Sequence, residues 1–204
     1  MLVKICGVRS ISMARTGAGA GADFLGFNFV PSSRRKVTIS QARKIIESLP
    51  KKNRPSLVGV FQNQPLTFVK KTASALGLDY VQLHGQESPL YCKKLKNIKI
   101  IKAFGMHSNF KIKDAVDEMK KYEADLFMAD RANRGQGDLL KLKNISSLSK
   151  KYKVILAGGL APAHLTNVKK SVPQLFAVDV AGGIETNGQP DLKKIKQFVK
   201  LAKT

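Results

Sequence analysis

Eight short apolar runs alternate with amphipathic stretches along this chain of 204 residues, and that alternation restricts its fold more than any other feature. The runs cover Leu2–Cys6, Phe24–Phe29, Leu57–Phe61, Tyr80–His84, Lys99–Phe104, Leu126–Asp130, Val154–Ala157 and Ala177–Val180. Each is rich in Val, Ile, Leu or Phe and is bounded by Gly, Pro or polar residues. This pattern predicts buried β-strands.

The stretches between these runs have the spacing of amphipathic helices. Pro65, Pro89 and Pro162 stand at first-turn positions, and Ser40 and Asp191 are predicted N-caps. The predicted helices cover Ser10–Gly19, Ser40–Leu49, Pro65–Leu76, Pro89–Leu95, Lys111–Tyr122, Lys141–Lys150, Pro162–Val172 and Leu192–Ala202.

Strand and helix alternation of this kind implies parallel strands joined by crossover helices. An open, doubly wound sheet is the competing α/β architecture, but it needs no eighth unit and favours a GxGxxG turn after its first strand. The first strand here runs instead into Cys6, Gly7, Val8 and Arg9. We therefore predict that residues 1–204 form one catalytic domain, a closed (β/α)8 TIM barrel.

The charge of the chain is unusual, because 36 Lys and Arg residues against 14 Asp and Glu residues give a net charge of +22. Such a charge attracts nucleic acids and other polyanions, or anionic substrates. The lysine doublets are spread along the chain, each in or beside a predicted helix, and no aromatic stripe or zinc-finger spacing accompanies them. A polyanion-binding protein on a barrel scaffold is thus the non-enzymatic alternative, and nucleic acid is disfavoured as a partner.

Other sequence features concern location and cofactors. No apolar run approaches the roughly 20 residues of a membrane helix, and the first residues lack a signal-peptide stretch. The cysteines, Cys6 and Cys92, are too few for a disulfide scaffold, and the three histidines lack metal-ligand spacing. We expect a cytoplasmic protein with no metal, cofactor or membrane partner. The sequence does not fix the oligomeric state, and a monomer is slightly favoured.

The active site of a (β/α)8 barrel lies at the carboxyl ends of its strands. Four predicted strands carry a polar side chain there, namely Cys6, His84, Asp130 and Asp179. Side chains alternate along a strand, so Lys4 shares a face with Cys6 and Gln82 with His84. Taken singly, each has a structural explanation: a buried thiol, a hydrogen-bonded histidine or a helix cap. Their convergence on one rim favours a catalytic site.

Two glycine pairs follow the last strands, Gly158 with Gly159 after the seventh and Gly182 with Gly183 after the eighth. Glycine lets backbone N–H groups approach an anion closely, and barrel enzymes often bind phosphate at these loops. Plain turns are the alternative. We predict that the two pairs bind the phosphate of a small phosphorylated substrate.

A basic loop follows the second strand and is predicted to overhang the same rim. It contains Arg34 and Arg35. An arginine can hold a carboxylate or phosphate in bidentate fashion, although a solvated basic loop is the alternative in so basic a chain.

Motifs over nearly the whole chain resemble those of one family. They are KICG at 4–7, GADFLGF at 21–27, VGVF at 58–61, QLHG at 82–85, AGGL at 157–160 and the segment 179–185, with Gly188 and Asp191 after it. In this order they resemble phosphoribosylanthranilate isomerase of tryptophan biosynthesis. The resemblance implies a (β/α)8 barrel that converts N-(5-phosphoribosyl)anthranilate to 1-(2-carboxyphenylamino)-1-deoxyribulose 5-phosphate by an Amadori rearrangement, without a cofactor.

The resemblance also implies roles for single residues. Cys6 falls on the family's general base, Asp130 on its general acid and Arg35 on the arginine that holds the anthranilate carboxylate. We assign Gln82, His84 and Asp179 to substrate binding as well. An acid must be protonated and a thiol deprotonated for this reaction. We therefore expect burial to raise the pKa of Asp130 and Lys4 to lower that of Cys6.

The chain also departs from the family pattern. The loop after the sixth strand reads RGQG at 134–137 where GG[ST]G is usual, LKL at 140–142 replaces FDW, and AGG at 181–183 replaces SSG. Arg34 replaces the proline before the loop arginine. These changes affect the expected anthranilate side and a hydroxyl contact to phosphate. The enzymatic alternatives are a relative of indole-glycerol-phosphate synthase and a ribulose-phosphate epimerase, the latter disfavoured because no His/Asp metal cluster is visible.

Overall fold

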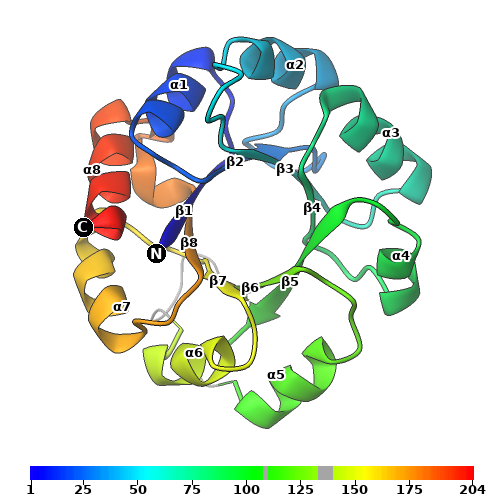
Figure 1. Cartoon of the computed structure of the whole chain (residues 1–204), viewed down its shortest axis with the longest axis vertical. Coiled ribbons are helices and arrows are strands. Elements are labelled where there is room, and N and C mark those ends of the chain that lie inside the picture. Colours follow the sequence, from blue (N-terminus) through cyan, green and yellow to red (C-terminus); the bar gives the residue numbers. More distant parts are fainter. Residues whose placement is uncertain (108–109, 133–139) are drawn as a thin grey trace.

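In the computed structural model, eight parallel strands close into a barrel (Figure 1). The structure describes residues 1–107, 110–132 and 140–204. The strands are β1 Leu2–Cys6, β2 Phe24–Asn28, β3 Ser56–Phe61, β4 Tyr80–Leu83, β5 Lys99–Met106, β6 Leu126–Arg131, β7 Val154–Leu156 and β8 Ala177–Val180. Neighbours in the chain are neighbours in the barrel, and β1 pairs with β8. The predicted (β/α)8 barrel is confirmed, and the open sheet is excluded.

Helices follow the strands and cover the outside of the barrel (Figure 1). They are α1 Ile11–Gly19, α2 Ile39–Glu47, α3 Leu66–Leu76, α4 Pro89–Lys93, α5 Ile112–Met119, α6 Leu142–Ser149, α7 Leu165–Ser171 and α8 Leu192–Lys203. Short 3-10 turns, η1 Pro162–His164 and η2 Gly182–Ile184, and a small hairpin of β9 Glu185–Thr186 and β10 Gln189–Pro190 complete the described chain. No helix in the described ranges combines the length and apolar character needed to cross a membrane.

The N-cap predictions are confirmed at one helix and wrong at another. Asp191 caps α8 by accepting hydrogen bonds from the N–H groups of Lys193 and Lys194. Ser40 does not cap α2, because Thr38 takes that position. The Thr38 hydroxyl accepts from Gln41 N, and the Gln41 side chain accepts from Thr38 N in return. This reciprocal capping box satisfies two backbone donors at the start of the helix.

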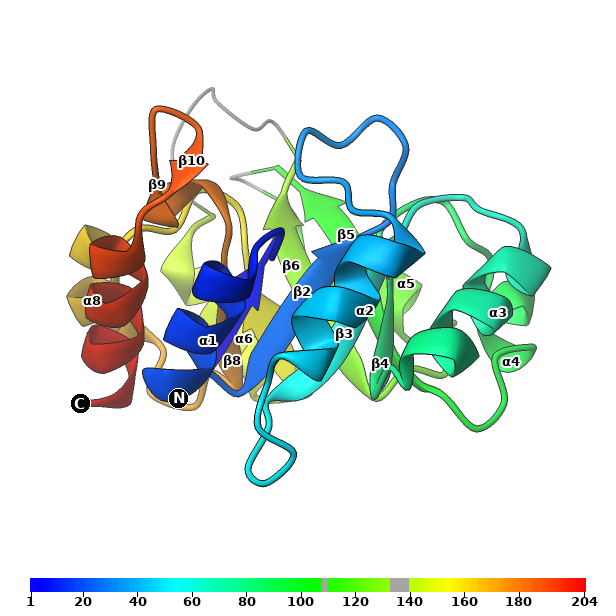
Figure 2. The ribbon, with the colours of Figure 1, turned by 90° about the horizontal axis from the view of Figure 1, so that it is seen from above.

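The predicted alternation of side chains is confirmed, and it divides the core into two layers. Val3 and Ile5 belong to the large outer cluster between sheet and helices. Apolar residues fill the inside of the barrel, and they include Phe24, Val58 and Met128. Beyond these apolar residues, toward the carboxyl ends of the strands, polar side chains line the inside of the barrel. Figure 2 shows the loop after β2 and the β9–β10 hairpin rising at this same end.

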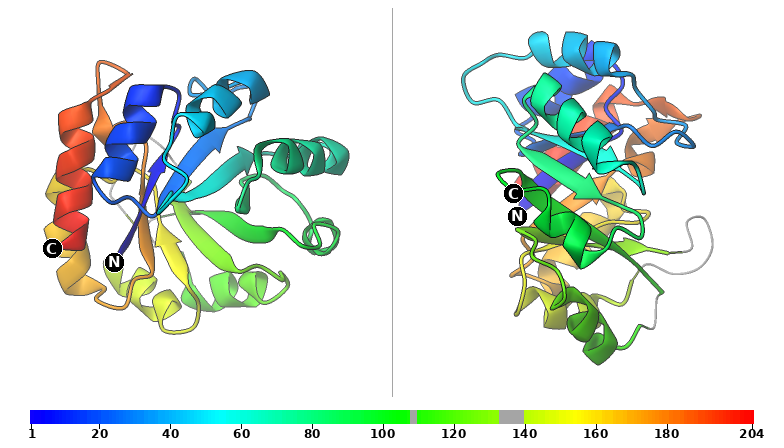
Figure 3. Two further views of the ribbon diagram at one scale, coloured as in Figure 1. Left: turned by 45° about the horizontal axis from the view of Figure 1, so that its top comes forward. Right: turned by 90° about the vertical axis from the view of Figure 1, so that its right-hand side faces the viewer.

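Three aspartates fasten the opposite end of the barrel. Each stands just before an even-numbered strand and accepts from a backbone N–H of the preceding strand. The pairs are Asp23 with Val3 N at 2.7 Å, Asp79 with Leu57 N at 2.7 Å and Asp125 with Ile100 N at 2.8 Å. Figure 3 shows the two chain ends side by side near β1, where Lys203 also pairs with Asp23. The amino-terminal face thus carries structural contacts.

Candidate active site

A cavity of about 1260 Å³ opens at the carboxyl ends of the strands. Its lining includes every residue that the sequence assigned to a site: Cys6, Arg35, Gln82, His84, Asp130, Gly158, Gly159, Asp179, Gly182 and Gly183. The barrel therefore brings these residues together, as their positions at strand ends predicted. The RGQG segment at 134–137 lies outside the described residues.

Cys6 stands at the top of β1 beside a buried ion pair. Lys4 lies two residues before Cys6 on the same face of the strand and is fully buried. Its Nζ donates to Oδ1 of Asp179 at a distance of 2.7 Å, and Asp179 is the residue that pairs with Lys4 on β8. A side chain on Gly26 would place its Cβ 3.0 Å from both Cys6 Sγ and Lys4 Nζ. Glycine at position 26 on β2 thus leaves room for the thiol and the ammonium.

The expectation that the Cys6 thiol is acidified is wrong for the protein without ligand. Burial raises the pKa of this thiol and Asp179 raises it further, whereas the Lys4 ammonium and the Gly7 N–H lower it by less. Burial alone would lower the pKa of Lys4, but Asp179 and Cys6 raise it. Lys4 therefore acts on Cys6 in the predicted direction, but its charge is largely compensated by Asp179.

Asp130 on β6 is joined to β4 through a chain of side chains. His84 Nε2 lies 2.9 Å from Asp130 Oδ2, and Gln82 Nε2 lies 2.9 Å from His84 Nδ1. An amide nitrogen only donates, so Nδ1 accepts and a neutral imidazole carries its proton on Nε2. His84 then donates to Oδ2 of Asp130, which leaves Oδ1 able to carry a proton. Gln82 Oε1 is buried and has no hydrogen-bond partner in the described part of the structure.

Arg35 lies on the rim, but one edge of its guanidinium is occupied by Glu185. Its Nε and Nη2 lie 2.8 and 2.6 Å from the two carboxylate oxygens. Arg34 Nη2 is 2.9 Å from the same carboxylate, and Arg9 Nη2 is 3.7 Å away. The Glu185 side chain is only 6% exposed. Sequence reasoning missed Glu185 as a partner of Arg35.

Three of the four glycines, Gly158, Gly159 and Gly183, are required by the backbone of the rim. Gly158 and Gly159 have φ of 91° and 83°, and a Cβ on Gly158 would lie 2.5 Å from Arg131 N. A Cβ on Gly183 would lie 1.9 Å from Leu160 O. The loops after β7 and β8 therefore pack directly on each other. At Gly182 the nearest atom to a Cβ is Arg35 Nη2 at 3.4 Å, so this position faces the basic loop.

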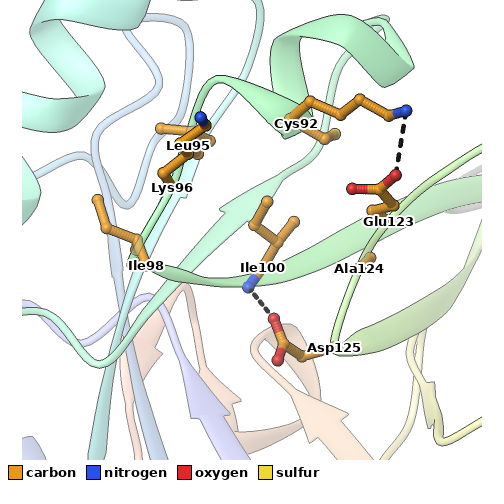
Figure 4. A pocket seen from close by; sticks show the side chains of 9 residues that line it. Cys92, Leu95, Lys96, Ile98, Ile100, Glu123, Ala124 and Asp125 are labelled. Atoms are coloured by element: carbon orange, nitrogen blue, oxygen red, sulfur yellow. Dashed lines mark hydrogen bonds and ion pairs between the residues drawn. The ribbon is translucent and has the colours of Figure 1, made fainter.

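A second, smaller cavity of about 630 Å³ lies between α4 and the start of β5 and β6. Figure 4 shows its carboxylates already in use: Asp125 accepts from Ile100 N, and Glu123 pairs with Lys93 at 3.0 Å. We assign no chemistry to it. Among the residues that the structure describes, no group of His, Cys, Asp and Glu side chains gathers as a metal site requires.

A closed parallel barrel with a thiol, a carboxyl group and glycine-rich loops on its carboxyl rim defines an enzyme of the (β/α)8-barrel class. Residues 3–201 match the family model described as N-(5'phosphoribosyl)anthranilate (PRA) isomerase. The N-(5'-phosphoribosyl)anthranilate isomerase of Desulforudis audaxviator is 38% identical over 99% of this chain and 98% of its own. The chain therefore belongs to the phosphoribosylanthranilate isomerase family, a family of tryptophan biosynthesis, and the resemblance seen in its motifs is confirmed.

Solved structures agree. The phosphoribosyl anthranilate isomerase of Thermotoga maritima superposes with a TM-score of 0.88 at 32% identity, over all of this chain and 99% of that one. Another structure of the family, in complex with reduced 1-(o-carboxyphenylamino)-1-deoxyribulose 5-phosphate, gives a TM-score of 0.86 at 32% identity over 100% and 98% of the two chains. The fold of this chain is thus the fold of solved isomerases.

Proposed function

We propose that this chain converts N-(5-phosphoribosyl)anthranilate to 1-(2-carboxyphenylamino)-1-deoxyribulose 5-phosphate, with Asp130 as general acid and Cys6 as general base. The observation that carries the proposal is that both residues line one cavity, on strands β6 and β1, with His84 hydrogen-bonded to the acid. The direct experiment is to follow turnover of this substrate by the purified protein. No turnover would exclude the proposed function.

Asp130 has the first role, which is to open the ribose ring. It transfers a proton to the ring oxygen while the C1–O bond breaks and the nitrogen lone pair forms a C1=N iminium. His84, fixed in one tautomer by Gln82, holds the carboxyl group toward the cavity. The buried, unpartnered Gln82 Oε1 is an acceptor that a ribose hydroxyl would satisfy, which supports Gln82 as a substrate-binding residue.

Cys6 has the second role, which is to remove the proton from C2. The C–H electrons then form the C1=C2 bond and neutralise the iminium. The resulting enol gives the ketone when C1 gains a proton and the hydroxyl on C2 loses one. The thiol of the free protein is protonated at neutral pH because burial raises its pKa. The iminium places a positive charge beside it, and a nearby opposite charge favours the thiolate. The base is thus formed in the complex, with Lys4 supporting it from below.

The two anionic ends of the substrate explain the rest of the rim. We assign the phosphate to the loops of Gly158, Gly159, Gly182 and Gly183, because backbone N–H groups can approach an anion where no Cβ intervenes. The anthranilate carboxylate goes to Arg35, whose guanidinium presents a second edge beyond the one that Glu185 occupies. Asp179 holds Lys4 and lines the cavity, so it contacts the substrate from below.

Replacing Arg35 by methionine should raise KM more than it lowers kcat. The carboxylate contact is present in both ground and transition states, and losing a charge-assisted hydrogen bond of about 1.5–3 kcal/mol corresponds to a rise of about tenfold to a hundredfold. Arg34 and Arg9 still pair with Glu185, so the fold should survive. The matched control is Arg43→Met on the exposed face of α2. An unchanged KM would remove Arg35 from the carboxylate site.

Replacing Gly182 by alanine tests the phosphate site without disturbing the acid. Its Cβ would meet only the flexible Arg35 side chain, whereas a Cβ on Gly158 would lie 2.8 Å from Asp130 Oδ1. We expect KM and the inhibition constant of inorganic phosphate to rise together by about tenfold, the effect of losing about 1.4 kcal/mol of binding. Gly19→Ala on α1, where a Cβ meets nothing within 4 Å, is the control. If neither constant changes, phosphate binds elsewhere.

The remaining proposals concern the setting of the enzyme. We propose a cytoplasmic protein that acts without a cofactor, and a monomer, although one solved relative is described as monomers generated from a dimeric isomerase of Thermotoga maritima. Polyanion binding is the competing use of the +22 charge. It should weaken steeply between low and moderate salt, whereas isomerase turnover should persist.

A further inference from the structure

A buried ion pair lies beneath the rim, and the steps proposed above do not use it, although its lysine, Lys102, reaches the lining of the cavity. Lys102 Nζ on β5 is 2.8 Å from Glu87 Oε2, and the two side chains are only 3% and 2% exposed. Lys102 alternates with Ile101 and Ala103, which face the barrel interior, so it points into the layer between sheet and helices. Isolated charges are costly in such an apolar layer, so this pair needs a reason to be there.

The hydrogen bonds of the pair converge on the backbone around His84. Lys102 Nζ donates to Gly85 O at 2.7 Å and lies 3.5 Å from Leu83 O, the carbonyls on either side of His84. Glu87 Oε2 accepts from Gly85 N at 3.0 Å. Both backbone groups of Gly85 are therefore held by the two charged side chains.

This arrangement begins where the regular sheet ends. The ladder between β4 and β5 stops at Leu83 opposite Lys102. On the other side, His84 N still donates to Phe61 O of β3 at 2.8 Å. On the β3 side a backbone hydrogen bond therefore holds this part of the chain, and on the β5 side the side chains of Lys102 and Glu87 hold it. Together they fix the peptide that carries the imidazole.

The neighbouring loop is tied into the same network. Glu87 Oε1 accepts from Asn63 N at 2.8 Å, and Asn63 Oδ1 accepts from Gln86 N at 2.6 Å. A Cβ on Gly85 would lie 2.3 Å from Asn63 Oδ1. The loops after β3 and β4 are consequently packed together with little room to shift.

Neutral groups surround the pair in the described structure. Tyr91 and Cys92 face it from α4, and Tyr122 faces it after α5, with Lys102 Nζ 5.7 Å from the Tyr122 ring centre. Burial raises the pKa of Tyr91 to about 12 and raises those of Cys92 and Tyr122. These groups are uncharged at neutral pH, so the two ions compensate each other.

We propose that Lys102 and Glu87 are positioning residues, which hold the β4–α4 loop so that His84 meets Asp130 in the geometry that catalysis requires. The inference rests on the proposed roles of His84 and Asp130. A buried ion pair contributes little net stability compared with apolar residues of similar size. In this protein the ion pair fixes the backbone of Gly85, next to His84. Through that backbone it fixes the chain of hydrogen bonds from Gln82 through His84 to Asp130.

The test replaces both ions together, as Glu87→Leu with Lys102→Met. This double variant leaves no unpaired buried charge, but it removes the hydrogen-bond partners of Asn63 N, Gly85 N and Gly85 O, so its melting temperature should fall moderately. We expect kcat to fall by about tenfold to a hundredfold, since a misplacement of 1 Å can cost about a hundredfold. The matched control is Lys113→Met with Asp117→Leu, an exposed ion pair on α5, which should leave kcat unchanged.

Nitrogen-15 NMR of the histidine rings separates positioning from catalysis. In the wild type His84 should show one tautomer, with its proton on Nε2, and the double variant should lose this signature. Unchanged His84 signals with unchanged kcat would overturn the inference. Changed signals with unchanged kcat would uphold the positioning but remove His84 from the proposed mechanism.

A second variant covers the case in which the double replacement does not fold. Asn63→Gly keeps the positive φ of 55° and removes only the bond to Gln86 N from an exposed residue. It should shift the same His84 signals to a smaller extent. Signals identical to those of the wild type would overturn the inference.

Discussion

Cys6→Ser is expected to lower kcat by at least about a hundredfold, the low end of what general-base catalysis supplies. A serine hydroxyl keeps the size of the thiol but does not ionise near neutral pH, so the proton on C2 has no acceptor. Cys92→Ser is the matched control, because that thiol belongs to α4, is buried and does not line the active-site cavity. Activity close to that of the wild type in Cys6→Ser would exclude Cys6 as the base.

The raised pKa of Cys6 gives this prediction a pH dependence. An ordinary thiol is a few per cent thiolate at pH 7, and the raised value makes that fraction smaller still in the free protein. Alkylation by iodoacetamide, measured in the Cys92→Ser background, should therefore increase steadily with pH through 7 and 9. A plateau near neutral pH would show an acidified thiol and contradict the proposed formation of the base in the complex. A bound substrate analogue with a cationic C1 substituent should shift the titration to lower pH.

The fold was largely predictable because local patterns determine its units. Every predicted strand is present, and no end differs from its predicted position by more than two residues. The fifth strand continues to Met106 rather than Phe104, because Gly105 and Met106 still pair with Asp130 and Arg131 of β6. Apolar content alone does not reveal such an extension, since it depends on the neighbouring strand.

The members of the site were predictable, but their partners were not. Alternation along each strand places Cys6, His84 and Asp130 on the inner face, and the closed barrel then brings them together. Lys4 pairs with Asp179, 175 residues away, and Arg35 with Glu185, 150 residues away. These choices follow from the register of the barrel and the shape of the loops, which periodicity does not encode. The error about the Cys6 pKa has a related origin, because it left out the burial of the thiol and the nearby Asp179.

The sequence did contain a signal for the ion pair of Lys102 and Glu87. A lysine inside an otherwise apolar strand is unusual, and an acid two residues after the QLHG motif supplies its partner. Conversely, the GAD motif is one of the motifs that carry the family resemblance, and it contains Asp23. In the structure Asp23 fastens β1 to β2 at the amino-terminal face, far from the cavity. Part of the family resemblance therefore reflects stability.

Asp130→Asn is expected to give the largest loss of kcat with the smallest change in affinity. The amide keeps the shape of the side chain, and its oxygen can still accept from His84 Nε2, but it has no acidic proton to transfer to the ring oxygen. Because the acid acts in the transition state, kcat should fall by about a hundredfold to ten-thousandfold while substrate binding survives. Asp114→Asn, on the exposed face of α5, is the control and should be silent.

The comparison with Arg35→Met turns this into a test of the whole mechanism. Asp130 and Arg35 lie on the same rim, yet one is assigned to proton transfer and the other to a carboxylate that is bound throughout. They should therefore show opposite kinetic signatures, a fall in kcat for the first and a rise in KM for the second. The residual kcat/KM of Asp130→Asn should also climb with pH, because the titration of the Cys6 base remains when the acid is gone. If Asp130→Asn raised KM and Arg35→Met lowered kcat, the roles would be exchanged and the proposed proton path would be wrong.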